Sequence, residues 1–399
     1  MRAICLVLHR WFGLSAAVFL FIAGLTGAVI SWDHELDAWL NPALYEARTT
    51  GADRKPLDLV AALEAREPEL QVRYAPLAVG PGHALLVFVA PREAGQALPY
   101  NQVALDPATG EVQGRRFWGA PALSRENLLP FLYKLHYSMH IPDVGGVEAG
   151  VLFMGVIGVA WVVDCLVALW LSFPSAASWR KSFSLRWKQG GFRLLFDVHR
   201  SGAVWAWLLV LTVAVTSVSM NLEHQFVRPV VNSVSPLTPS PFDAPPRAVA
   251  VPPVQSRAEV IERGLVRARE LDINAPAGGV FYSPEFNVYG VGFFEPGHDH
   301  GDDGLGNPWL YFDGQTGAVV GENIPGRGSA GDLFMQAQFP LHSGRIAGVP
   351  GRIAVSLLGL LVATLSVTGV VIWARKRRSL AVARARRGLS PDPTPVRSV

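Results

Sequence analysis

Four apolar runs dominate the sequence, and each is long enough to cross a lipid bilayer. A membrane-spanning helix needs about 20 consecutive apolar residues, and runs of that length occupy residues 11–32, 150–173, 202–222 and 353–374. The first run exceeds the apolar core of a signal peptide and no A-x-A cleavage site follows it, so we expect it to be retained. Half of the residues are hydrophobic and 17% are charged, which excludes an ordinary soluble protein. We therefore predict a mainly α-helical membrane protein built on a four-helix bundle.

Basic residues gather in the connection after the second run and in the C-terminal segment. Such clusters mark the cytoplasmic side of a membrane, so both termini are expected inside and the two long connections in the periplasm of a bacterial inner membrane. Because topology explains these charges, we predict contact with the lipid bilayer and no nucleic-acid binding. The expected division is helix 1–32, periplasmic domain 33–149, helix 150–173, cytoplasmic loop 174–201, helix 202–222, periplasmic domain 223–352, helix 353–374 and cytoplasmic tail 375–399.

Each long connection carries the pattern of a small α+β domain. In both, a helix precedes strand-like segments, and a similar turn, D-P-A-T-G-E-V in the first and D-G-Q-T-G-A-V in the second, lies between two strand-like stretches. A Pro-rich linker over 236–253 leads into the second domain. The expected helices are 57–69 and 256–270, and the expected strand-forming segments are 83–91, 101–114, 278–294 and 309–322.

The two halves of the chain form a tandem repeat of helix, exported domain and helix. His9 and His199 are 190 positions apart, and Thr26 and Thr216 keep the same offset. Further along, the segments K-L-H-Y-S (134–138) and P-L-H-S-G (340–344) correspond. A repeat of this kind usually gives a bundle with a pseudo-twofold axis.

Histidines stand at matching membrane depths in the two halves. His9 and His199 lie at the cytoplasmic ends of the first and third runs, where a pseudo-twofold axis would bring them face to face. Imidazoles from two facing helices are suitable axial ligands of a b-type haem, and a four-helix bundle is a usual scaffold for such a site. We predict that they bind one haem, with Arg10 and Arg200 neutralising its propionates. The alternative role of the two arginines is anchoring at the cytoplasmic surface.

A second haem is expected near the exported face. His136 and His342 precede the second and fourth runs and are its predicted ligands. The helix from His9 to His34 covers roughly 37 Å, so one haem cannot serve both levels. His34 also forms a symmetric pair with His224 and is an alternative ligand at the exported site. The chain lacks C-x-x-C-H, which excludes a c-type haem, and its two cysteines do not staple an exported domain.

Several other polar residues have two interpretations. Asp164 lies inside an apolar run, where a carboxylate either carries a proton or bonds a neighbouring helix. His140, four residues after His136, would share its helix face and offer a metal site from those two alone. The Gly-rich segment 296–304, with two histidines and three aspartates, is either a solvated loop or a weak metal contact. Two Thr-Gly pairs allow close helix approach or leave room for a macrocycle: Thr26-Gly27 and Thr368-Gly369.

Nearly the whole chain resembles the PepSY-associated transmembrane proteins, an iron-regulated inner-membrane family that includes ferric-siderophore reductases. The motifs that carry the resemblance are L-H-R-W-F-G-L (8–14), L-T-G-A-V-I-S-W-D-H-E-L-D-A-W-L-N-P-A-L (25–44), L-Y-K-L-H-Y-S-M-H (132–140), W-V-V-D-C-L-V-A-L-W-L-S-F-P (161–174), F-D-V-H-R-S-G-A-V-W-A-W (196–207), F-P-L-H-S-G-R-I-A-G-V-P-G-R (339–352) and V-T-G-V-V-I-W-A-R-K-R-R (367–378). The resemblance implies four transmembrane helices, two periplasmic PepSY-like domains and b-type haem between the helices. It also implies reduction of a ferric chelate, such as a ferric siderophore, in the periplasm, and places His9, His136, His199 and His342 in the motifs that carry the family's histidines.

The function expected from these features is a ferric-chelate reductase that conducts electrons through two haems. No G-x-G-x-x-G follows a strand and no cytoplasmic segment has room for a flavin domain, so the electron donor is an external soluble reductase or a quinol. Two other functions are considered. One is a membrane-anchored PepSY module that binds a periplasmic partner, and the other is a transporter with Asp164 on its proton path.

Overall fold

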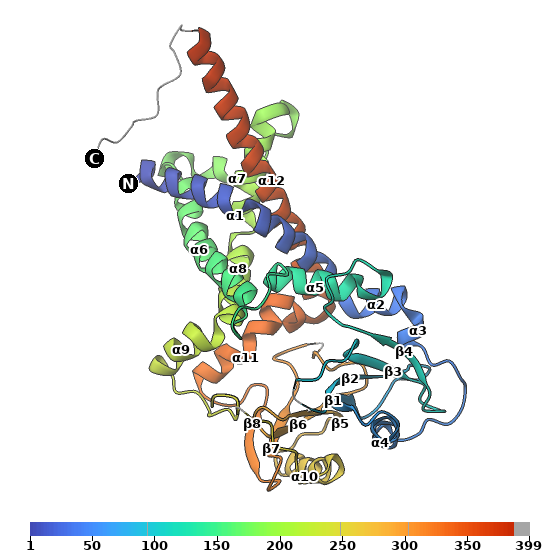
Figure 1. The fold of residues 1–399 in the computed structure, drawn as a ribbon. Coiled ribbons are helices and arrows are strands. Elements are labelled where there is room, and N and C mark those ends of the chain that lie inside the picture. Colours follow the sequence, from blue (N-terminus) through green and yellow to red (C-terminus); the bar gives the residue numbers. More distant parts are fainter. Residues whose placement is uncertain (94, 248, 302, 387–399) are drawn as a thin grey trace.

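The computed structural model describes residues 1–386 except 94, 248 and 302, so the predictions for residues 387–399 lie outside the described part of the chain. A bundle of long helices stands on one β-sheet, and both the N-terminus and the C-terminal end of the last helix point away from the sheet (Figure 1). The long helices of the bundle are α1 (Arg2–Ile30), α6 (Ala149–Ser172), the consecutive helices α7 (Gly191–Trp205) and α8 (Trp207–Asn221), and α12 (Gly348–Arg386).

The bundle has the composition of a membrane domain. Three helices, α1, α6 and the α12 region, are each long and apolar enough to cross a bilayer, and the α7–α8 pair gives up to four crossings if it counts as one span. Large apolar side chains on their outer surfaces are exposed, including those of Val18, Val163, Leu208 and Leu357. Exposed apolar side chains at this density suit contact with lipid rather than water.

The third predicted span, 202–222, is not a straight helix. The chain bends by 69° between α7 and α8, so His199 lies on a separate helix and only α8 continues the span. Trp205 and Trp207 flank the bend, and their indole N–H groups donate to the carbonyls of Phe183 and Cys165, on different elements. Hydrogen bonds from Arg186 to Asp197 and from Ser201 to the carbonyl of Ser184 hold α7 on the connection before it. That connection contains the 3-10 helices η2 (Ala176–Phe183) and η3 (Trp187–Gln189). These anchors explain why a continuous apolar pattern contains a break.

Small residues let the long helices approach closely. A Cβ atom on Gly24 of α1 would stand 2.5 Å from the carbonyl oxygen of Gly359 in α12, and one on Gly359 would stand 2.4 Å from that of Gly24. Across the bundle, a Cβ on Gly155 of α6 would meet the side chain of Leu222, just after α8. The pairs α1–α12 and α6–α8 are related by the tandem repeat, as a pseudo-twofold bundle requires.

The two long connections join into one sheet. The eight strands have the order β4-β3-β2-β1-β5-β6-β7-β8, with antiparallel pairing throughout. The halves meet where Tyr74, Ala75 and Pro76 of β1 pair with β5. The sequence analysis missed β1, the strand that makes this junction. The strands are β1 (Leu70–Pro76), β2 (Leu85–Pro91), β3 (Gln102–Leu105), β4 (Val112–Arg116), β5 (Ala277–Ser283), β6 (Val288–Phe293), β7 (Trp309–Asp313) and β8 (Val319–Asn323).

One hydrophobic core serves both halves of the sheet. The helices α4 (Pro56–Arg66) and α10 (Arg257–Glu270) confirm the helices predicted from the sequence, and both lie on the side of the sheet away from the bundle (Figure 1). Leu59 and Leu63 of α4 belong to the same buried cluster as Val260 of α10 and the inward side chains of the strands. The α+β segments predicted in the two long connections therefore share one sheet and one core.

The repeated turn has the same construction in both halves. Asp106 accepts hydrogen bonds from the backbone N–H (2.9 Å) and the hydroxyl (3.1 Å) of Thr109. Asp313 accepts the same two from Thr316, at 2.8 and 3.0 Å. A carboxylate that bonds backbone two or three residues ahead is a frequent means of closing a turn, which explains why Asp and Thr recur at this spacing.

Short helices connect the sheet to the bundle. Two of them, α5 (Leu128–Ser138) and α11 (Ala330–Ser343), lie between the two layers and end near the bundle helices (Figure 1). A buried ion pair of 2.7 Å between Arg116 at the end of β4 and Asp37 of α2 fixes the first half of the sheet beneath the bundle. The remaining short elements are α2 (Asp33–Leu40), α3 (Pro42–Tyr45), η1 (Arg125–Asn127), the π-helix η4 (Glu223–Val227), α9 (Arg228–Val234) and η5 (Arg345–Ala347).

Candidate functional site: two histidine pairs

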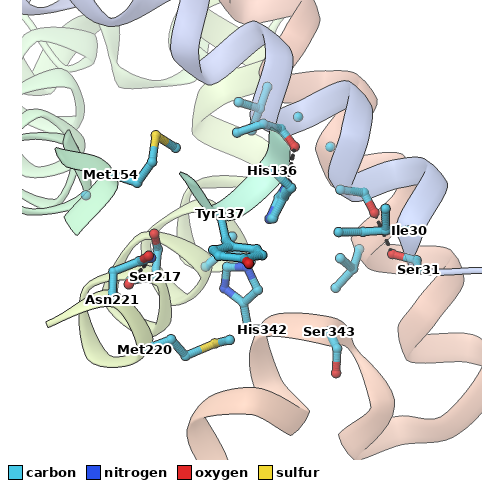
Figure 2. Close-up of a pocket in the computed structure, with 18 of the residues that line it drawn as sticks. Ile30, Ser31, His136, Tyr137, Met154, Ser217, Met220, Asn221, His342 and Ser343 are labelled. Carbon is cyan, nitrogen blue, oxygen red and sulfur yellow. Dashed lines mark hydrogen bonds between the residues drawn. The ribbon is translucent and has the colours of Figure 1, made fainter. Parts of the chain in front are cut away.

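The structure brings together the two histidines predicted for the exported side. His136 lies near the end of α5 and His342 near the end of α11, and their ring centres are 6.0 Å apart with the planes at 65°. Figure 2 shows both rings projecting into the same space, with Tyr137 beside them. The two short helices are counterparts in the repeat, which is why the pair forms across the pseudo-twofold axis.

Hydrogen bonds fix the protonation of this pair. The Nδ1 atom of His136 is 3.0 Å from the carbonyl oxygen of Ala23, and a carbonyl oxygen only accepts, so Nδ1 carries the proton. The Nδ1 atom of His342 is 2.9 Å from the hydroxyl of Thr216, whose own hydrogen is donated to the carbonyl of Thr212. Both neutral imidazoles therefore leave Nε2 unprotonated, with a lone pair free for a metal.

The second predicted pair also forms, at the opposite end of the bundle. The ring centres of His9 on α1 and His199 on α7 are 6.2 Å apart. The Nδ1 atom of His9 lies 2.9 Å from a carboxylate oxygen of Asp164, and that of His199 lies 3.0 Å from the hydroxyl of Thr368. The Thr368 hydroxyl donates to a backbone carbonyl, so it accepts from His199. Within the described part of the chain, none of the four histidines has a hydrogen bond at Nε2.

The geometry of each pair suits two ligands of one metal ion. A metal–nitrogen bond would be about 2 Å long, and ring centres 6.2 and 6.0 Å apart would leave room for one metal ion between the imidazoles of each pair. Hydrogen bonding at the other ring nitrogen, here from Nδ1 to a carboxylate, hydroxyl or carbonyl, is the usual support for a metal-bound histidine. Each of the four paired histidines has such a hydrogen bond at Nδ1, and the four occupy repeat-related positions.

The two Thr-Gly pairs lie against these rings. A Cβ atom on Gly27 would be 3.0 Å from Cε1 of His136, and one on Gly369 would be 3.2 Å from Cε1 of His199. The hydroxyl of Thr26 is 3.1 Å from Nδ1 of His136. In both pairs the threonine orients the imidazole and the glycine leaves space for it. Of the two roles predicted for these dipeptides, close approach is observed, here between each glycine and a histidine ring, and room for a macrocycle stays a prediction.

A cavity surrounds the His136–His342 pair. Its volume is about 280 Å³, and its walls come from α1, α5, α6, α8, α11 and α12. Most of the lining is apolar, and the close-up shows Met154, Met220 and Ile30 around the two rings (Figure 2). At the end nearest the sheet, the lining includes Asp33, His300 and Arg345. The cavity therefore links the histidine pair in the bundle to polar groups beside the sheet.

The two pairs occupy different levels of the bundle. His136 contacts α1 at Ala23, fourteen residues after His9. At 1.5 Å per residue, about 21 Å of helix separates these positions. The hydrocarbon core of a bilayer is about 30 Å thick, so the two pairs lie at different depths. The His9–His199 pair, farther from the sheet, is called the upper pair, and the His136–His342 pair, nearer the sheet, the lower pair.

The arginines predicted to accompany the first pair lie in other surroundings. Arg10 is exposed, with its guanidinium over the ring of Trp11. Arg200 donates to the carbonyl of Lys181 and lies 3.3 Å from Asp197, which Arg186 also binds at 2.7 Å. Arg10 directly follows His9 in the sequence, and Arg200 directly follows His199. Arg200 helps to hold α7 on the basic connection.

The remaining histidines do not join the two pairs. His34 is beside His300, with ring centres 4.6 Å apart, and does not line the cavity. His224, the repeat counterpart of His34, is exposed on η4, whereas the ring beside His34 is that of His300. His140 does not share a helix face with His136, because α5 ends at Ser138 and His140 has a φ of 53°. Its Nε2 atom instead bonds a carbonyl of α5 at 2.9 Å.

Asp164 is a candidate functional residue from the sequence, but the sequence does not show that its partner is His9. The carboxylate joins α6 to His9 of α1, which favours the helix-bonding interpretation. Its repeat counterpart is Thr368, which supports His199 in the same way. The sequence contains a signal for this role. The second span of each half carries a hydrogen-bonding side chain, Asp164 or Thr368, at the depth of His9 and His199.

The chain belongs to the PepSY-associated transmembrane family. The family model described as the PepSY-associated TM region matches residues 6–376, most of the sequence and both halves of the repeat. A search of curated proteins gives no match. The family match confirms the resemblance found in the sequence motifs and extends over all four paired histidines.

Proposed function

We propose that this family member is a b-type haem protein of a bacterial inner membrane that conducts electrons to a ferric chelate, such as a ferric siderophore, in the periplasm. The observation that carries the proposal is the presence of two facing imidazole pairs at two levels of the bundle, each with Nε2 available. Paired imidazoles are suitable axial ligands of b-type haem. Haem bound in this way supplies one-electron redox chemistry.

The residues around the pairs fit this cofactor. Each imidazole is already oriented through Nδ1, so a metal at Nε2 needs no change in protonation. The lower pair lines a largely apolar cavity, which suits a macrocycle. His9, His199 and Asp164 would hold the upper group, and His136 and His342 the lower one.

The charge pattern supports the orientation. The basic connection between α6 and α7 and the basic end of α12 lie at the end of the bundle away from the sheet (Figure 1). Lys and Arg favour the cytoplasmic side, so the sheet belongs in the periplasm. Electrons would enter near His9 and His199 from a soluble reductase or a quinol and leave through the centre at His136 and His342.

Iron chemistry explains what such a path achieves. Siderophores hold ferric iron through hard oxygen donors, and ferrous iron carries less charge and binds such ligands less tightly. One electron per iron therefore releases the metal. The protein's part is to hold the redox centres, keep their surroundings apolar and expose one end to the chelate.

Rapid mixing under anaerobic conditions tests the proposal. The reduced protein is mixed with a ferric siderophore, and reoxidation of the haem is followed together with capture of ferrous iron by a chromogenic chelator. We expect one ferrous ion per electron lost by the wild type and by His83→Ala, whose exposed imidazole is on a loop of the sheet. His342→Ala should lose the activity. Haem that stays reduced in the presence of the chelate would refute the reductase.

Two other functions make different predictions. A PepSY module that only binds a periplasmic partner, or a proton-coupled transporter, needs no redox cofactor. Either would be isolated without haem and would tolerate His9→Ala and His199→Ala. Nothing in the two histidine pairs would be needed for those activities, which is why the reductase is preferred here.

A further inference from the structure

A third cluster of possible ligand side chains, two histidines and one aspartate, lies beside the cavity, and one of its histidines, His300, lines it. One ligand atom each from His34, Asp299 and His300 lies within 4.8 Å of the others. His34 is in the first turn of α2, and the other two are on the connection between β6 and β7, so residues far apart in the sequence converge here. The rings of His34 and His300 meet edge to face, with centres 4.6 Å apart.

The connection that carries Asp299 and His300 is held in place. The side-chain amide of Asn307 donates to the carbonyls of His298 (2.6 Å) and Asp299 (3.1 Å). The backbone N–H of Gly304 donates to the carbonyl of Ile346 in η5, which ties the connection to the bundle side. The cluster therefore does not depend on chance contacts of a free loop.

His34 is fixed from the other side. Its neighbour Asp33 lies 3.8 Å from Arg345, and its neighbour Glu35 pairs with Arg352 of α12 at 2.7 Å. Both flanking carboxylates are thus committed to arginines, and the imidazole between them is left facing His300 and Asp299. The carboxylate of Asp299 bonds Nδ1 of His300 at 3.0 Å.

Two imidazoles and one carboxylate are a recognisable ligand set. This combination, with coordination positions left open, is characteristic of non-haem Fe(II) sites. The side chains of His300 and Asp299 are 37% and 32% exposed, so an ion can reach them. His300 also lines the cavity that contains His136 and His342, so the cluster adjoins that cavity through this one residue.

We propose that His34, Asp299 and His300 form a binding site for a divalent metal ion and that the ion is Fe(II). The site stands on its own geometry. We further propose that the site is the first to bind ferrous iron after it leaves a reduced chelate, and this role rests on the function proposed above. No electron is transferred at this site, because iron arrives already reduced and is bound by the three side chains.

Equilibrium dialysis with ferrous iron under anaerobic conditions, without any siderophore, tests the site. The wild type and the control His83→Ala should bind one Fe(II) at this site. In His34→Ala and His300→Ala the affinity should fall by at least about 100-fold, since even supporting residues around a metal site change affinity by 10- to 100-fold. Asp299→Asn should weaken binding in the same direction while keeping the size of the side chain.

Haem content and thermal unfolding are measured on the same samples. Unchanged values with lost Fe(II) binding support the site. Wild-type protein that binds no Fe(II), or binding that is unaffected in all three variants, overturns it. Binding of Zn(II) without Fe(II) overturns the identity of the ion. A protein that binds Fe(II) here but reduces no chelate would refute the proposed function and leave the metal site standing.

Discussion

Replacing Asp164 by asparagine should raise the midpoint potential of the haem proposed at His9 and His199. The Asp164 carboxylate lies 2.9 Å from Nδ1 of His9, and its side chain is only 14% exposed. A negative charge there stabilises the oxidised haem more than the reduced one, because oxidation adds positive charge at the iron. Asparagine keeps a hydrogen-bond acceptor and removes the charge.

The magnitude follows from the geometry. The hydrogen bond of 2.9 Å together with the imidazole ring and a metal–nitrogen bond of about 2 Å puts the charge about 7 Å from the iron. At an effective dielectric constant of about 20, a unit charge at that distance contributes about 2.4 kcal/mol. For a one-electron couple, this corresponds to a rise of roughly 100 mV.

A redox titration followed by the α-band resolves the effect. The haem proposed at His136 and His342 would serve as an internal reference, since Asp164 bonds His9 of the other pair. Thr368→Val is the matched variant: it removes the hydrogen bond to His199 without removing a charge, so its shift should be smaller. A shift below about 20 mV at the upper haem, or an equal shift at both haems, would show that Asp164 does not act as a charged support for His9.

Three further predictions concern packing and polar contacts. Thr216→Val removes the acceptor from Nδ1 of His342 and should weaken haem binding at that pair by 10- to 100-fold, measured by haem transfer to apomyoglobin; retention equal to wild type would contradict the tautomer argument. Gly24→Ala should lower the stability of the bundle by about 1–3 kcal/mol, because its Cβ meets the backbone of α12. In contrast, Gly13→Ala on the same helix meets nothing within 4 Å and should be neutral or stabilising in the same detergent melt. Burial raises the pKa of Asp106, but hydrogen bonds from two threonines outweigh it and hold the pKa well below its usual range. The stability that Asp106 contributes is therefore present at neutral pH and is lost as the pH falls below about 4, and Asp106→Ala should melt lower at pH 7 with a flatter acid dependence.

The helices and the paired histidines could be predicted from the sequence for a physical reason. Apolar runs of membrane length leave few alternatives to helices, and the offset of 190 residues between His9 and His199 aligns the two halves. Once the halves are related by a pseudo-twofold axis, equivalent residues at equal depth face each other wherever they point toward that axis. The pairs at 6.2 and 6.0 Å confirm that reasoning about proximity.

Contacts between distant segments could not be predicted in the same way. The junction of β1 with β5 joins strands about 200 residues apart, and each strand is short enough to fit several partners. The bend of 69° between α7 and α8 depends on where Trp205 and Trp207 find acceptors. Local patterns carry no information about either event.

The two halves of the repeat differ in the surroundings of His34 and His224. Its counterpart His224 has the same offset, but the π-helix η4 leaves His224 exposed. His34 instead meets Asp299 and His300, on a longer connection that the first half of the sheet does not have. The sequence repeat therefore predicts which histidines meet inside the bundle, where the packing is repeated. It does not predict the neighbours of His34, because the connection that carries His300 is longer than its counterpart in the first half.

The ratio of haem to protein tests the central claim most directly. The protein is purified in detergent from cells supplied with haem, and a pyridine haemochrome assay is combined with spectra before and after dithionite. The account predicts a ratio near two, sharp reduced α-bands, and loss of one haem in each of His199→Ala and His342→Ala but not in His83→Ala. A colourless wild-type protein would contradict the account and leave the two histidine pairs without a redox role.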